Sequence, residues 1–193
     1  EETCETFLKE KNFDWIFIIG WSQIATKNIL DIPRYGIIGA HPTLLPQGRG
    51  RASIPWAILK GLEKTGVSFF KINQGVDTGD IIHQEEIIIS KNDDATTLYE
   101  KVKIAHFRGI SKIVPKLVNL DLKLIKQDES RSSYWPGRRP EDGEINMKGS
   151  VLDAYRLIRA TTKPYPGAFY YQGKKKIIVW KAKIIKKNIL TKN

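Results

Sequence analysis

A histidine and an aspartate 36 residues apart could share one acid–base task. His41 directly follows a short apolar run and precedes Pro42, which fixes its own φ and biases His41 toward extended geometry. Asp77 lies in a glycine-bounded loop after another apolar run. A carboxylate beside an imidazole stabilises the protonated ring and fixes its tautomer, as general acid–base catalysis requires. We therefore predict a catalytic His41–Asp77 pair. Asp80 is the rival carboxylate, but it starts the next strand.

Short apolar runs that alternate with amphipathic stretches predict the elements that position this pair. Strands are expected at 14–20, 35–40, 65–72 and 80–89, and helices at 26–30, at 53–62 and from Asp94 or Thr97 to about Leu120. This order predicts an α/β, Rossmann-like, mainly parallel sheet, parallel at first and mixed later, with helices on both faces. Ligands bind at the carboxyl ends of the strands in open parallel sheets, and His41 ends such a strand.

The chain divides into a larger and a smaller part. We expect a catalytic core over 1–129, incomplete at its N-terminus because the chain does not begin with Met, and a Pro-, Gly- and charge-rich linker over 130–149. A small basic, β-rich subdomain is expected over 150–193, with a helix over 150–160 and strands over 167–173 and 175–185. Residues 151–193 hold 11 Lys and Arg and one acid, and so carry +10 of the net charge of +11. Such a surface suits phosphates or is simply solvated, and composition does not choose between these readings.

Three motifs resemble the formyltransferase family that uses 10-formyltetrahydrofolate. They are HPTLLPQGRG (41–50), GVDTGDII (75–82) and YPGAF (165–169), and the resemblance runs from about residue 14 to residue 185. It implies transfer of a formyl group to an amine through a tetrahedral intermediate. It also implies that His41 handles protons or stabilises the oxyanion, while Asp77 holds His41 and relays protons. The residues implied to contact the folate are Trp21, Gly75, Val76, Thr78, Gly79 and Asp80.

One position departs from the family's Asn-x-His…Asp pattern, because Gly39 stands where the family has Asn. An Asn amide would donate to the developing oxyanion, and losing such a donor typically costs about 3 kcal/mol. Either another donor takes over, such as Ser22, Gln23 or a water in the space that Gly39 leaves, or the protein binds folate with little catalysis. We hypothesise that Ser22 or Gln23 replaces the Asn.

Two amine substrates divide the family: nucleotide-linked amino sugars and methionyl initiator tRNA. The stretches RGRASIPWAI (49–58) and YWPGRRPEDGEI (134–145) resemble the sugar enzymes. Arg49 and Arg51 could hold a pyrophosphate, with solvated loop charge as the alternative for both. Tyr134 and Trp135 could cover a sugar or base. The substrate-binding candidates are Arg49, Arg51, Tyr134 and Trp135. The basic C-terminal segment suits tRNA instead, so an amino sugar is the expected partner and tRNA the alternative.

Composition argues against several other classes of protein. No run approaches the roughly 18 apolar residues of a membrane span, and no signal peptide is visible, so no membrane association is expected. The single cysteine, Cys4, leaves no internal disulfide and fits a cytoplasmic location. The three His residues and the Cys are too scattered for metal-ligand spacing, so no metal is expected. The sequence leaves open whether the chain forms a homodimer. It also leaves open the alternative that the protein is a non-catalytic basic binding module.

Overall fold

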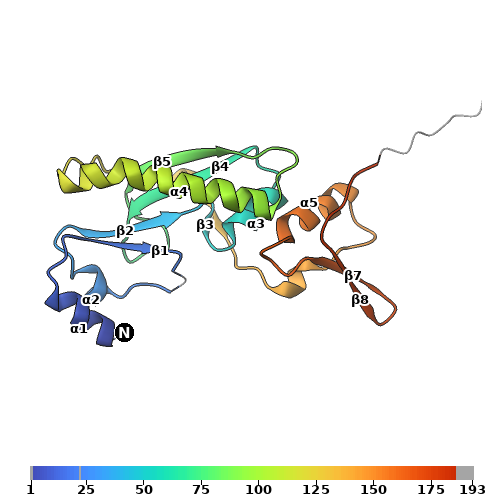
Figure 1. The fold of residues 1–193 in the computed structure, drawn as a ribbon, viewed down its shortest axis with the longest axis horizontal. Helices are drawn as coiled ribbons and strands as arrows, with labels where there is room; N and C mark the ends of the chain where they lie inside the picture. Colours follow the sequence, from blue (N-terminus) through green and yellow to red (C-terminus); the bar gives the residue numbers. More distant parts are fainter. Residues whose placement is uncertain (1, 22, 186–193) are drawn as a thin grey trace, which may run out of the picture.

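A four-stranded sheet forms the centre of the computed structural model, which describes residues 2–21 and 23–185 (Figure 1). The strands lie in the order β1 (Trp15–Ile19), β2 (Gly36–His41), β4 (Lys64–Lys71) and β5 (Ile81–Ile88). β1 and β2 are parallel, whereas β4 runs antiparallel to both β2 and β5. The Rossmann-like α/β class is confirmed, and the sheet is parallel at first and mixed later. Its described part, expected to be mainly parallel, has one parallel and two antiparallel pairings.

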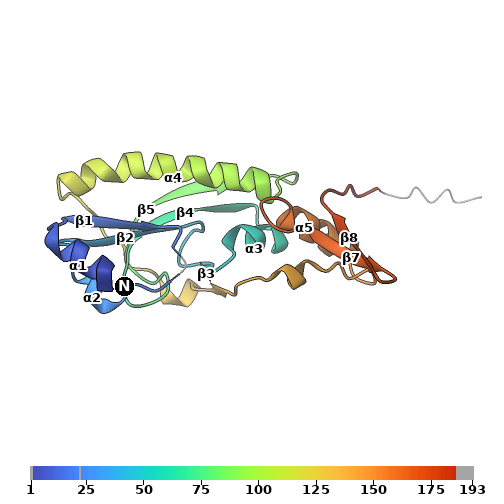
Figure 2. The same ribbon diagram turned by 60° about the horizontal axis from the view of Figure 1, so that its bottom comes forward.

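Helices cover both sides of this sheet (Figure 2). The helices are α1 (Glu2–Glu10), α2 (Lys27–Leu30), α3 (Ser53–Leu59), α4 (Ala95–Val118) and α5 (Val151–Thr161). α4 runs along one side of the sheet, and α1 and α2 lie on the other. The N-terminus of α4 is fixed by a capping box, in which the Asp94 carboxylate accepts from the Thr97 amide and the Thr97 hydroxyl accepts from the Asp94 amide. Asp94, not Thr97, is therefore the N-cap.

The core lies between α4 and the strands β4 and β5. The buried side chains of α4 recur at helical spacing, because a helix packed on a sheet buries one stripe. Phe69 of β4 is fully buried there, and a Cβ on Gly109 of α4 would lie 2.0 Å from its ring. A glycine at 109 therefore lets the helix approach the sheet closely. No helix of the described ranges combines the length and apolarity of a membrane span.

After α4 the chain returns to the segment that follows β2 and pairs with it. The segment predicted as a linker contains a short strand, β6 (Tyr134–Trp135), which pairs in parallel with β3 (Arg49–Gly50). The Arg49 amide donates to the Ser133 carbonyl at 2.9 Å, and the Gly48 amide donates to the Ser133 hydroxyl at 2.9 Å. This part of the chain is therefore hydrogen-bonded to β3, although its composition is that of a connecting loop.

The C-terminal part is one helix and a hairpin. α5 packs near α3 and is followed by β7 (Ala168–Gln172) and β8 (Lys175–Val179), which pair antiparallel. The strand predicted over 175–185 ends at Val179, and the last basic residues of the sequence fall outside the described part of the chain. The limits of the core, linker and C-terminal subdomain stay a prediction.

Asp93 joins the start of α4 to its surroundings. Its side chain is buried and accepts hydrogen bonds from Lys101, from the Thr97 hydroxyl and from the Ser90 amide, while its carbonyl accepts from Arg159 of α5 at 2.7 Å. Burial disfavours the charged form, but these donors outweigh burial and lower the pKa of Asp93 below its ordinary value. The stabilisation is therefore present above the ordinary Asp pKa of 3.8 and is lost as the pH falls through the lower folded-state pKa.

We expect Asp93→Asn to lower the free energy of unfolding at neutral pH by about 1–3 kcal/mol, because it leaves buried donors poorly paired. The difference from the unsubstituted protein should shrink below about pH 4, where the unfolded carboxyl takes up its proton. Urea denaturation at neutral and acidic pH measures both effects. Asp94→Asn is the matched control, since Asn caps a helix about as well as Asp. Equal stability of the two variants would contradict the assigned role of Asp93.

Candidate active site

A cavity of about 630 Å³ opens where the parallel strands β1 and β2 end. His41 is the last residue of β2, and Trp21 follows β1 closely. Both line the cavity, as do Val76 and Asp77 from the loop after β4. The strand-end location expected for His41 is therefore confirmed, because the carboxyl ends of parallel neighbours meet at one edge of a sheet.

The His41 ring is buried and held at both nitrogens. Its Nε2 lies 2.7 Å from the Gly48 carbonyl and 3.4 Å from the Ser53 hydroxyl. A carbonyl only accepts, so Nε2 carries a hydrogen in this contact. Nδ1 lies 3.5 Å from Asp77 Oδ2. In the neutral ring the free lone pair is therefore on Nδ1, the nitrogen that faces the carboxylate, and a proton added there gains an opposite charge.

Asp77 reaches His41 by a route that the sequence does not predict. Because β4 is antiparallel to β2, Lys71 at the end of β4 pairs with Ile38, and the following loop starts away from His41. The loop then folds back, with Asp77 at a positive φ of 55°, so that its carboxylate accepts from the Gly50 amide at 2.8 Å. The predicted pair is brought together, but by the folding back of the loop and not by parallel neighbouring strands.

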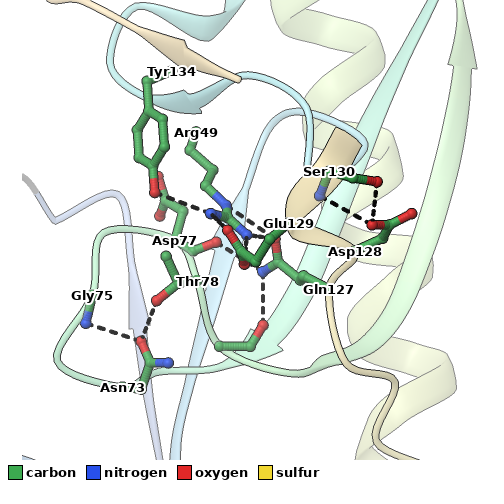
Figure 3. A network of polar contacts seen from close by, with 11 residues as sticks. Arg49, Asn73, Gly75, Asp77, Thr78, Gln127, Asp128, Glu129, Ser130 and Tyr134 are labelled. Atoms are coloured by element: carbon green, nitrogen blue, oxygen red, sulfur yellow. Dashed lines mark hydrogen bonds and ion pairs between the residues drawn. The ribbon is translucent and has the colours of Figure 1, made fainter. Parts of the chain in front are cut away.

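Arg49 does not face the cavity, contrary to its predicted role as an anion-binding residue. Its side chain is 0% exposed and donates to Gln127 Oε1, to both oxygens of Glu129 and to the Tyr134 hydroxyl (Figure 3). The hydrogen bond with Glu129 is the main reason that the pKa of Arg49 is raised, against the effect of burial. A guanidinium already paired in this way has no donor left for a substrate phosphate, whereas Arg51 is exposed and lines the cavity.

The other predicted site residues divide between the cavity and its supports. Trp21, Gln23, Gly75 and Val76 line the cavity, and Ser22 lies outside the described residues. The remaining candidates are not among the residues that line the cavity: Thr78, Gly79, Asp80, Tyr134 and Trp135.

Contacts elsewhere account for four of these five. The Thr78 hydroxyl donates to Asn73 Oδ1 at 2.8 Å, and a Cβ on Gly79 would lie 1.6 Å from the Lys71 carbonyl oxygen. Tyr134 is engaged with Arg49. Trp135 is buried, with its ring 2.7 Å from the position that a Cβ of Gly48 would occupy. These residues support the site and do not form its walls.

The space beside Gly39 is filled by apolar side chains. A Cβ at this position would lie 2.9 Å from Phe70 Cζ and 3.0 Å from Ile72 Cγ1. The room for a side chain at position 39 is therefore narrow, but Gly39 itself lines the cavity, and a water beside it stays a prediction. Of the two predicted side-chain donors, Gln23 lines the cavity.

Sequence reasoning missed two groups of residues at this site. Tyr99 of α4 and Tyr165, which precedes β7, line the cavity with ring centroids 6.4 Å apart. Burial raises the pKa of the Tyr165 phenol, and Tyr99 adds to the effect, so Tyr165 stays neutral. Gln127 and Glu129 lie in a stretch without hydrophobic periodicity, so no pattern in the sequence could single them out.

The cavity fits a ligand of folate size. Its volume lies within the roughly 300–1,000 Å³ of small-molecule sites, and Trp21, Ile24, Phe70 and Ile72 give it the apolar and aromatic lining that a pterin ring requires. Exposed backbone of the loop at Gly75 supplies polar groups beside that lining. Within the described ranges, no cluster of three or more His, Cys, Asp or Glu side chains could hold a metal ion.

Fold and site together define a Rossmann-like α/β protein with a His–Asp pair in a strand-end cavity. The chain belongs to the formyl transferase family: the family model for formyl transferase matches residues 1–114, and that for the formyl transferase C-terminal domain matches residues 138–192. The family expected from the sequence motifs is thereby confirmed.

Individual relatives differ in length and in the molecules with which they are named or bound. The chain is 36% identical over 178 residues to the bifunctional polymyxin resistance protein ArnA of Wigglesworthia glossinidia brevipalpis, covering 92% of this chain but only 27% of ArnA. The methionyl-tRNA formyltransferase from Clostridium thermocellum shares 27% identity at a TM-score of 0.74, with 94% of this chain and 77% of that one covered. The N-formyltransferase from Helicobacter canadensis, in complex with folinic acid and dTDP-3-aminofucose, shares 25% sequence identity at a TM-score of 0.64. That match covers 75% of this chain and 53% of the Helicobacter chain.

We expect Gly39→Ala to lower the free energy of unfolding by about 1–3 kcal/mol, because the added methyl overlaps Phe70 and Ile72. Combining it with Ile72→Ala removes one of the two obstacles, so the double variant should lose less stability than the sum of the two single variants. Urea denaturation of the three variants measures this coupling. Strictly additive losses would show that Gly39 is not packed as described.

Proposed function

We propose that this chain transfers a formyl group from 10-formyltetrahydrofolate to the primary amine of a nucleotide-linked amino sugar. The observation that carries the proposal is the pair of buried His41 and half-buried Asp77 in a cavity of folate size, in a chain of the formyl transferase family. Bound there, the folate supplies the formyl carbon as an electrophile. The remaining chemistry is proton transfer and charge stabilisation, which side chains of the cavity provide.

His41 acts in this proposal through Nδ1. Its Nε2–H is engaged with the Gly48 carbonyl, so Nδ1 accepts the proton that the attacking amine loses. Asp77 stabilises the resulting imidazolium and, through water, passes the proton toward the leaving nitrogen. The Gly50 amide keeps the carboxylate aimed at the ring, since the Asp77 oxygen that it contacts is also the one nearest Nδ1.

Gln23 is the proposed donor to the negative charge that develops on the formyl oxygen, with Ser22 beside it in sequence. The proposal is supported by the location of Gln23 in the cavity lining and by the apolar filling around Gly39. The proposed folate contacts are Trp21, Gly75 and Val76, with Thr78, Gly79 and Asp80 completing that loop. Arg51, exposed at the cavity, is the proposed partner of the substrate's phosphates.

Methionyl initiator tRNA is the second candidate substrate. The β7–β8 hairpin presents exposed Lys174, Lys175 and Lys176, and a structural neighbour is a methionyl-tRNA formyltransferase. The amino-sugar proposal draws support from the exposed Arg51 and from the neighbour in complex with dTDP-3-aminofucose. A non-catalytic binding module is the alternative from another class, and it does not require His41.

We expect His41→Ala and Asp77→Asn each to lower kcat/KM by about 10²–10⁴-fold, the usual contribution of a positioned acid–base group. Tetrahydrofolate release from 10-formyltetrahydrofolate, with a panel of amino-sugar nucleotides, is the measurement. His83→Ala is the matched control, because His83 is a half-buried β5 residue paired with Glu85 and does not line the cavity. Release that persists at full rate without His41 would refute the proposed chemistry.

The salt dependence of turnover distinguishes the two amines. An amino-sugar nucleotide has few phosphates, so KM should change little between about 50 and 200 mM salt, whereas a tRNA held through many phosphates would lose orders of magnitude in affinity. Steady-state kinetics at several salt concentrations, with both substrates, measures this difference. Turnover only with charged initiator tRNA, with a steep rise of KM with salt, would replace the amino sugar by tRNA.

A further inference from the structure

Topology alone does not bring Asp77 to His41. β4 ends opposite Ile38, inside β2, so the loop from Asn73 to Asp80 must fold back over the sheet for the Asp77 carboxylate to come within 3.5 Å of the imidazole. Asp77 has a positive φ of 55°, in the left-handed region that Asp enters more readily than most residues but less readily than glycine. Contacts from outside the loop help to hold it in this shape.

Gln127 makes those contacts. Its side-chain amide donates to the backbone carbonyls of Asp77, at 2.8 Å, and of Gly79, at 2.7 Å (Figure 3). The two carbonyls lie on either side of Thr78, so one amide group holds both ends of the turn that carries the Asp77 carboxylate. Asn73, by contrast, binds the Gly75 amide and the Thr78 hydroxyl and so fixes only the internal shape of the loop.

Arg49 dictates which way the Gln127 amide points. Its Nε and Nη2 donate to Gln127 Oε1 at 3.1 Å and 2.8 Å. A guanidinium has donors only, so it selects the oxygen of the amide and leaves the NH₂ group to face the two carbonyls. Arg49 itself forms an ion pair with Glu129 and donates to the Tyr134 hydroxyl, and these contacts fix the orientation of its guanidinium. The orientation of the amide is thus enforced by a charge.

The same stretch of chain holds Asp77 from its other end. Gly50, next to Arg49 in β3, donates its amide hydrogen to the Asp77 carboxylate, while Gln127 holds the Asp77 carbonyl. Backbone and side chain of the aspartate are therefore both hydrogen-bonded to one group of residues, which we call the Gln127 latch and define as Gln127, Arg49, Gly50 and Glu129.

We propose that Gln127 is a positioning residue for the reaction, which sets the distance between Asp77 and His41 through the two carbonyls that it binds. The inference rests on the proposed formyl transfer for its kinetic consequence, and on geometry alone for its structural consequence. Gln127 does not line the cavity, so it acts on the reaction through the loop that carries Asp77.

The test is Gln127→Glu, which keeps the side-chain size and the pairing with Arg49 but replaces the donating NH₂ by a carboxylate oxygen that repels both carbonyls. The Asp77 turn should move away, and the Gly50 amide should lose its acceptor. We expect hydrogen exchange of the Gly50 amide, followed by NMR on the whole chain, to quicken about tenfold or more. We expect kcat for formyl transfer to fall about ten- to a hundredfold, and KM for the folate to change much less, because Gly75 stays held by Asn73.

Two further variants keep the test decisive. Glu129→Gln removes the charge that pairs with Arg49 but keeps a hydrogen-bond acceptor, and should produce the same two effects at smaller size. Asp93→Asn, which costs stability at the start of α4 outside the latch, should leave both Gly50 exchange and kcat unchanged. A merely structural role for Gln127 predicts instead that Asp93→Asn and Gln127→Glu act alike.

The outcomes separate this inference from the proposed function. Unchanged Gly50 exchange in Gln127→Glu overturns the latch, and faster exchange with unchanged kcat overturns its positioning role. The unsubstituted protein could fail to transfer a formyl group to any amine while Gln127→Glu still shows faster Gly50 exchange. That result overturns the proposed function but supports the inference that Gln127 holds the Asp77 turn.

Discussion

The arrangement of the site depends on the buried guanidinium of Arg49. Removing a charge from water costs several kcal/mol unless it is paired and hydrogen-bonded, so a fully buried arginine requires partners around it. Here those partners are Gln127, Glu129 and Tyr134, all contributed by the segment that follows α4. Burial of the Arg49 charge therefore requires that segment to pack against the loop after β2, and this packing places β6 beside β3.

This constraint converts four distant pieces of chain into one rigid frame. The end of β2, the strand β3, the loop after β4 and the segment around β6 meet within hydrogen-bonding distance of one another. A frame of this kind holds an acid–base pair in a fixed relation before any ligand arrives, which is what electrostatic catalysis requires. The residues that perform the chemistry in our proposal thus depend on others that never reach the cavity.

The apolar environment of Gly39 sets this chain apart from the pattern that its motifs resemble. Phe70 and Ile72 fill the space into which a side chain at position 39 would project. The absence of an amide there is consequently built into the packing of β2 against β4, and a single substitution cannot restore it without displacing those side chains. In our proposal, the donor to the formyl oxygen therefore lies elsewhere in the cavity lining.

The sequence by itself determined the local features: the strand that ends at His41, the loop with Asp77, the long helix that starts at Asp94 or Thr97, and the family to which these motifs belong. It could not determine the direction of β4, because a continuous apolar run reads the same in a parallel and an antiparallel strand. Nor could it separate Arg49 from Arg51, since two loop arginines in one motif differ only in what folds over them. Tertiary structure decided that Arg49 is buried and that Gln127 holds Asp77, because both depend on contacts between residues some 50 to 80 positions apart.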